Sequence, residues 1–176
     1  MPDHAFILFV LLHSIAAVLQ NGNPKSQEMK NDERLALMIS VLSEPVYLGH
    51  PLMVEAKLIN YGDHAVLVNS RMALGYENMP SRELYLKIID EKSGEHAGIY
   101  EVDINRDFPT PGDFCSLAPG DSLRVTFNLF EFYQLTRPGK YRLTAYYDAS
   151  EPLAAKPPGS DSGIVESNSL EVNVSK

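Results

Sequence analysis

The feature that most constrains this chain is an alternation of apolar and polar residues with a period of two, recurring from Leu35 to the C-terminus. Such alternation is typical of β-strands that have one face in a core and the other in solvent. It predicts eight strands, at residues 35–42, 52–59, 65–68, 84–88, 99–104, 123–129, 141–147 and 170–174. A single helical turn at residues 130–134 is the only helix candidate.

The turns between these segments favour one all-β domain over residues 35–176. Pro119-Gly120 and Pro138-Gly139 each place proline before glycine, which predicts type II turns. Seven to eight antiparallel strands in a domain of about 140 residues predict an immunoglobulin-like β-sandwich. The residues expected to be buried in it are Leu37, Ile39, Val54, Leu58, Leu86, Val125, Phe127, Tyr141, Leu143 and Val172. Tyr141 is expected to be either a tyrosine corner or a plain core aromatic.

The first segment reads as a signal-peptide-like leader at residues 1–20. Residues 5–19 are apolar except for His13 and Ser14, and this run is shorter than the roughly 20 residues that a membrane-spanning helix needs. A retained anchor and a buried first strand are the alternatives. Residues 21–34 are polar and are expected to form a flexible linker. The protein is therefore expected to be secreted or periplasmic, with no membrane span after cleavage of the leader.

Composition excludes several functional classes. The net charge of −8 argues against a nucleic-acid partner, which would need clustered Lys and Arg. The single cysteine, Cys115, excludes an intramolecular disulfide and a Cys-based zinc site, and is expected to be a small buried hydrophobe.

Motifs that resemble catalytic or metal sites are incomplete. Residues 120–123 spell GDSL, but no histidine follows them, so Ser122 lacks a base and a turn leading into a strand is expected. Asp103, Asn105 and Asp107 have the spacing of a calcium loop, yet Phe108 and Phe114 stand where an EF-hand requires Gly and Glu. Calcium ligands or solvated loop carboxylates are the alternatives there. The sequence therefore predicts neither an enzyme nor a cofactor.

Three loops are candidates for contact with another protein. The long loop at residues 149–163 is the first, and the turn at residues 60–64 is expected to lie at the same end of the sandwich. The loop at residues 71–82 is more apolar than a connector needs, so it either packs over a sheet edge or forms a contact surface. The candidate contact residues are Tyr61, His64, Met72, Tyr76, Met79, Leu153, Lys156, Pro157 and Pro158.

Residues 51–148 carry a family resemblance. The motifs are Tyr47-Leu48-Gly49 before Pro51, Leu58-Ile59-Asn60, residues 117–122 (LAPGDS), Leu129, Tyr133, residues 138–143 (PGKYRL) and Tyr147. This stretch resembles the immunoglobulin-like domain that precedes the catalytic domain in deuterolysin-type and peptidyl-Lys metalloendopeptidases, and its stand-alone relatives in exported bacterial proteins. The sequence lacks the His-Glu-x-x-His of those proteases. The resemblance therefore implies the accessory domain alone.

The two functional readings follow from these features. The first is a non-enzymatic, exported β-sandwich that acts as an interaction or accessory module. The second rests on a weaker likeness to the bacterial intracellular proteinase inhibitor family, which has a similar sandwich and a Pro-Gly-x-Tyr strand start. It implies loops presented to the active site of a protease.

Overall fold

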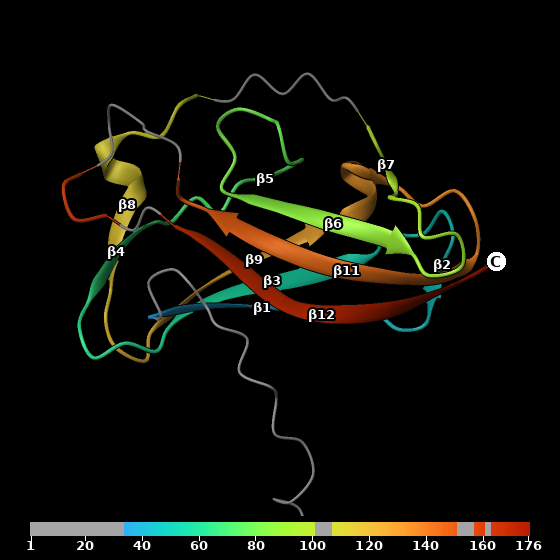
Figure 1. Cartoon of the computed structure of the whole chain (residues 1–176), viewed down its shortest axis with the longest axis horizontal. Helices are drawn as coiled ribbons and strands as arrows, with labels where there is room; N and C mark the ends of the chain where they lie inside the picture. The colour runs from blue at the N-terminus through green and yellow to red at the C-terminus, as the bar shows by residue number, and fades with distance from the viewer. Residues whose placement is uncertain (1–33, 101–106, 151–156, 161–162) are drawn as a thin grey trace, which may run out of the picture.

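The computed structural model describes residues 34–100, 107–150, 157–160 and 163–176 (Figure 1). This part of the chain is built from strands and two short 3₁₀ helices, so the all-β prediction is confirmed. The leader and almost all of the linker lie outside the described residues. The strands are β1 (Leu35–Val41), β2 (Val46–Tyr47), β3 (Met53–Asn60), β4 (Val66–Asn69), β5 (Leu74–Gly75), β6 (Leu84–Asp90), β7 (Gly98–Ile99), β8 (Phe114–Leu117), β9 (Ser122–Asn128), β10 (Tyr133–Gln134), β11 (Gly139–Asp148) and β12 (Ile164–Ser175).

One large sheet wraps around the core and nearly closes into a barrel. Its strand order is β5-β6-β11-β12-β1-β3-β9, with β2 added beside β12. The sheet is mixed rather than purely antiparallel, because β1 and β2 each run parallel to β12, and β5 runs parallel to β6. The parallel contact between β1 and β12 joins the first and last strands, and it connects the β9-β3-β1 half of the sheet to the β12-β11-β6 half.

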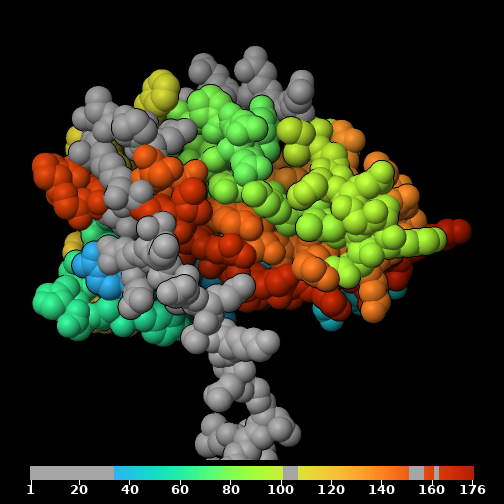
Figure 2. Space-filling model, in the orientation of Figure 1, coloured from blue at the N-terminus to red at the C-terminus, as the bar shows by residue number. Residues whose placement is uncertain are grey.

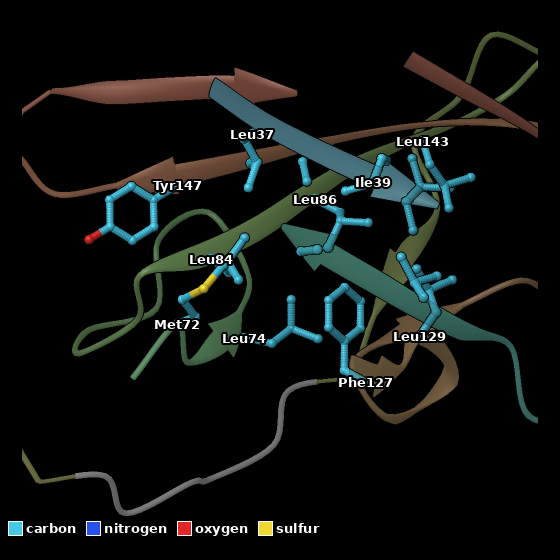
Figure 3. Close-up of a cluster of buried hydrophobic side chains, with 14 of the residues drawn as sticks. Leu37, Ile39, Met72, Leu74, Leu84, Leu86, Phe127, Leu129, Leu143 and Tyr147 are labelled. Carbon is cyan, nitrogen blue, oxygen red and sulfur yellow. The ribbon is translucent and has the colours of Figure 1, made fainter. Parts of the chain in front are cut away.

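The alternating residues of both halves meet in one apolar core. Figure 3 shows side chains from β1, β6, β9 and β11 converging there, together with Met72 and Leu74 from the 71–82 loop. Nine of the ten residues expected to be buried are buried. The exception is Val125, which packs against the core but is only half-buried. It lies in β9, an edge strand of the sheet with a neighbouring strand on one side only.

Tyr141 forms a tyrosine corner, the first of the two alternatives that the sequence left open. Its ring is buried in β11, and its hydroxyl donates a hydrogen bond to the carbonyl of Arg137, over 2.7 Å. This bond fixes the chain where it enters β11 from the preceding turn.

The predicted turns and loops differ in outcome. Gly120 has a φ of 81°, as the expected type II turn requires. The prediction for Pro138-Gly139 is wrong, because Gly139 does not have a positive φ and instead opens β11, paired with Val174. The candidate helical turn appears as the 3₁₀ helix η2 (Leu129–Glu131), one residue earlier than expected. A second 3₁₀ helix, η1 (Pro111–Asp113), precedes β8.

The sequence missed the short strands. β2, β5 and β10 are two residues long, and β8 is four residues long, so none is long enough to display a periodicity. Of the predicted strand at residues 99–104, β7 includes Ile99, and residues 101–104 lie outside the described part of the chain.

Candidate functional site

Two of the predicted contact loops lie at one end of the molecule, built around the antiparallel pair β4–β8. We call this the loop end; it comprises residues 60–64, β4, β8 and residues 157–160. Figure 1 shows it opposite β2, β7 and the C-terminus, and Figure 2 shows the 157–160 segment in red on the same side as the teal turn at residues 60–64.

Asn60 holds the turn of the loop end in place. It is fully buried, and its Nδ2 donates to the carbonyls of His64 and Leu117, both over 2.8 Å. Its Oδ1 accepts the backbone N–H of Gly62 over 2.9 Å. Because each polar atom of a buried amide must find a partner, this one side chain fixes both the turn and its distance from β8.

The second loop reaches the same place through β4. Ser160 forms a parallel bridge with Leu67, so residues 157–160 lie beside the strand that follows the turn. The hydroxyl of Ser160 donates to the carbonyl of Pro157 over 2.7 Å, which closes a tight turn there. Pro158 is exposed and Pro157 is half-buried. The candidate residues Leu153 and Lys156 lie outside the described residues.

The turn presents one large aromatic side chain to solvent. Tyr61 is 66% exposed. Next to it, Asp63 and His64 are both exposed and pair through Oδ1 and Nδ1 at 2.5 Å. The hydrogen bond from His64 lowers the pKa of Asp63 below its usual value. Among the aromatic residues of the described chain, only Phe108, at 67%, is as exposed as Tyr61.

Phe108 lies beyond the other end of the β4–β8 pair, away from the turn at residues 60–64. The guanidinium of Arg71, two residues after β4, donates to the carbonyl of Asp107 over 2.8 Å. Asn69, the last residue of β4, pairs with Phe114. Exposed aromatic side chains therefore lie near both ends of this short ladder, and we include Phe108 in the loop end.

The 71–82 loop packs onto the sheet, which corresponds to the first of its two alternatives. Met72 and Met79 are 1% and 5% exposed, so these two candidate contact residues lie in the core and present no surface to a partner. Tyr76 is half-buried and borders a smaller hollow beside Tyr133. Hydrophobic content alone could not distinguish a packed loop from a docking loop.

Buried charges anchor both ends of this loop. Glu83 is buried and accepts from Arg71 at 2.5 Å, from the amide of Asn69 at 2.9 Å and from the backbone N–H of Ala73 at 2.9 Å. At the other end Arg82 forms a buried pair with Asp148 at 2.9 Å. Burial raises the pKa of Asp148, but the hydrogen bonds from Ser150 and Arg82 outweigh it and leave the pKa lowered. The hydrogen bonds and ion pairs of these groups hold the loop on the sheet, so we assign them a structural role.

The motifs that resembled catalytic or metal sites fall in ordinary structural positions where they are described. Ser122 is the first residue of β9 and pairs with Ile59, as expected for a turn that leads into a strand. Cys115 is a half-buried free thiol in β8 that packs against the core. Asp103 and Asn105 lie outside the described residues. No group of three or more His, Cys, Asp or Glu residues that could hold a metal occurs in the described ranges.

A groove of about 500 Å³ lies at the opposite end of the molecule, and sequence reasoning missed it. We call it the end groove; residues 48–51 and 134–136 line it, together with Tyr100, Asn128 and Phe130. Its walls come from segments far apart in the chain, each of which reads in the sequence as an ordinary turn or strand start. No sequence signal connects them.

Comparison with known proteins adds no identity. No protein-family model matches the chain, and no curated protein matches it significantly. The resemblance to protease accessory domains and to proteinase inhibitors therefore stays a prediction. In the part of the chain that the structure describes, no helix has the length and apolarity needed to cross a membrane.

Proposed function

We propose that the protein is an exported, non-enzymatic β-sandwich of the immunoglobulin type that binds another protein through its loop end. The observation that carries this proposal is the exposure of Tyr61 and Phe108 on short segments held by a rigid scaffold. Aromatic side chains supply large contact areas and lose few degrees of freedom on binding, and they are enriched at the centres of interfaces.

The strand order supports the immunoglobulin part of the proposal. In such domains strands A, B and E share one sheet and C, F and G the other. In chain order, β1, β3 and β9 correspond to A, B and E, and β6, β11 and β12 to C, F and G. The tyrosine corner of Tyr141 also fits this class. One departure is that β8, in the place of strand D, pairs with β4 instead of β9.

The composition of the loop end favours a protein partner. Prolines at positions 157 and 158 restrict the unbound loop, so it loses less entropy when a partner covers it. The net charge of −8 disfavours nucleic acid.

The test compares variants of exposed aromatic residues at the two ends of the molecule. The mature protein is immobilised, partners are recovered from the periplasm or culture fluid of the native host, and the affinity of each purified partner is measured. We expect Tyr61→Ala with Phe108→Ala to weaken binding at least tenfold, about 1.4 kcal/mol. Tyr47→Ala is the control, because Tyr47 is 42% exposed but lies at the opposite end. Wild-type affinity of a folded loop-end variant would place the site elsewhere.

The same experiment distinguishes a proteinase inhibitor from an accessory module. If the recovered partner is a protease, the protein should inhibit its cleavage of a peptide substrate, and the loop-end variants should lose that inhibition. A recovered protease whose activity is unaffected would instead match the accessory-module reading.

Export has its own test. N-terminal sequencing of the protein from its native host is expected to give a mature end between Ala17 and Asn23. An intact Met1 on soluble cytosolic protein would contradict it.

A further inference from the structure

The end groove is distinguished by the chemistry of the described residues that line it. The chain carries 15 Lys and Arg and 23 Asp and Glu, yet none of these four residue types is among the described residues that line the groove. Leu48, Phe130 and Leu135 supply apolar walls. A charged ligand would lose water in this groove without gaining a counter-charge, so the lining favours an uncharged ligand. Its volume of about 500 Å³ is in the ordinary range for binding sites.

Several polar groups of the groove have hydrogen-bonding capacity that no described protein group uses. The Oδ1 of Asn128 accepts the N–H of Leu52 at 3.1 Å and that of Phe130 at 3.3 Å, which fixes the amide and leaves its Nδ2 unused. Within the described residues, no hydrogen bond engages the hydroxyls of Tyr100 and Thr136. Gln134 already donates to the carbonyl of Ile99 at 3.3 Å. The groove thus offers uncharged donors beside apolar walls.

A proline-rich segment is the ligand class that complements this arrangement. In the polyproline II conformation the backbone makes no internal hydrogen bonds, so its carbonyls are free to accept. Proline has no N–H, so such a segment brings almost no donors of its own. Its rings suit aromatic-lined grooves, and its preformed shape lowers the entropy lost on binding.

We infer that the end groove binds an uncharged, proline-rich segment of another protein in the polyproline II conformation. Tyr100 and Phe130 contact the proline rings, while the Tyr100 hydroxyl and the Asn128 amide donate to the carbonyls of the segment. This inference is independent of the function proposed for the loop end. The groove residues 48–51 follow β2 and Tyr100 follows β7, and both strands lie at the opposite end of the molecule from the loop end (Figure 1).

The test uses fluorescein-labelled decaproline as the probe and fluorescence anisotropy as the readout. Saturable binding to the full chain is expected, and Tyr100→Ala should weaken it at least tenfold. Tyr100 is 46% exposed, so this variant should fold like the wild type, which circular dichroism checks. Tyr100→Phe keeps the ring but removes the hydroxyl, so its affinity for decaproline should lie between those of the wild type and Tyr100→Ala. Tyr61→Ala is the matched control at the loop end and should bind like the wild type.

Two further measurements locate the site and identify the ligand class. Backbone NMR shifts on adding unlabelled decaproline should concentrate at residues 48–51 and 130–136, with residues 60–64 unchanged. An unlabelled Gly/Ser decamer has similar carbonyls without rings and should compete poorly. The absence of saturable binding, equal binding by Tyr100→Ala, or shifts confined to other residues would overturn the inference. So would displacement of the probe by maltohexaose at lower concentrations than by decaproline, since that result would assign the groove to neutral sugars.

Discussion

The side chain of Asn168 pairs with the backbone of Ile39 in the way that a neighbouring strand would. Its Oδ1 accepts the N–H of Ile39 at 2.8 Å, and its Nδ2 donates to the carbonyl of the same residue at 3.2 Å. The contact occurs at a bulge, where β12 has one residue more than β11. Thr144 pairs with Ser169 and Tyr146 pairs with Glu166, so three steps along β12 lie opposite two steps along β11. A side-chain amide thus replaces ladder bonds at the parallel contact that joins the two halves of the sheet.

Replacing this amide should destabilise the junction. Asn168→Ala leaves both polar groups of Ile39, a residue that is 4% exposed, without their partner. We expect a loss of about 1–3 kcal/mol in the free energy of unfolding, measured by urea denaturation. Asn168→Asp keeps the acceptor but loses the donor, so it should also destabilise. Asn173→Ala on the same strand is exposed and should change stability by no more than about 0.5 kcal/mol. Equal stability of Asn168→Ala and Asn173→Ala would show that water replaces the amide without cost.

A buried phenol joins the 71–82 loop to β6. Tyr133 donates to the carbonyl of Gly75 at 2.9 Å and accepts the N–H of Leu86 at 2.8 Å. Tyr133→Phe should cost about 1–3 kcal/mol in denaturant unfolding, because two buried backbone groups lose their partner. Tyr61→Phe is the exposed control and should be neutral.

The same phenol should make stability depend on alkaline pH. Burial raises the pKa of Tyr133 to about 12, above the value of about 10 in the unfolded chain. The unfolded state therefore releases this proton first, and the Tyr133 contribution to stability is complete below pH 10 and falls as the pH rises towards 12. The loss between these pH values should be smaller in Tyr133→Phe than in the wild type. Identical alkaline profiles in the two proteins would contradict this account.

The ring of Phe127 in β9 is part of the apolar core and lies close to Leu74 of the 71–82 loop (Figure 3). It is 8% exposed, so Phe127→Ala removes a buried ring and should cost roughly 3–5 kcal/mol. Phe108→Ala, which removes a ring that is 67% exposed, should have little effect on unfolding. Comparable losses in the two variants would mean that Phe127 is not part of the core in solution.

Arg137 should control the protonation of Asp90. The Arg137 guanidinium, 2.8 Å away, lowers the pKa of the Asp90 carboxyl, and the N–H groups of Lys92 and Ser93 lower it further against the opposing effect of burial. In Arg137→Gln the pKa of Asp90, followed by NMR of the carboxyl carbon, should rise. Arg124→Gln, whose guanidinium is 3.9 Å from Glu55, should leave it unchanged.

The sign of the pH effect follows from this lowered pKa. Ionised Asp90 stabilises the folded state above its unfolded pKa of about 3.9, and that stabilisation is lost as the pH falls through the lower folded value. Arg137→Gln should therefore be less stable than the wild type at neutral pH, with the difference shrinking in acid. A difference that stayed constant down to low pH would indicate an effect unrelated to Asp90.

Local pattern accounts for much of the fold. The alternation of Leu37, Ile39, Val54 and Leu58 specified strands and their buried faces, because a strand places alternate side chains on opposite sides whatever its neighbours are. The position of Tyr141 just after Pro138-Gly139 similarly made a tyrosine corner one of two expectations, and it is the one that the structure has. These features depend on residues close together in the chain.

The rest depended on contacts between distant residues, which no short stretch of sequence encodes. Gly139 resembled a turn residue, but pairing with Val174 drew it into β11. Met72 and Met79 could have faced either a partner or the core, and the buried pairs at Arg71 and Arg82 drew their loop onto the sheet. The parallel contact of β1 with β12 includes the bridge of Leu37 with Ser167 and the amide of Asn168, which binds Ile39, 129 positions away. The end groove likewise exists only because folding brings residues 48–51, 100 and 134–136 together. Sequence therefore determined which of the longer segments are strands and which faces they bury, whereas tertiary packing decided where the short strands form, how the strands join and where the surface is hollow.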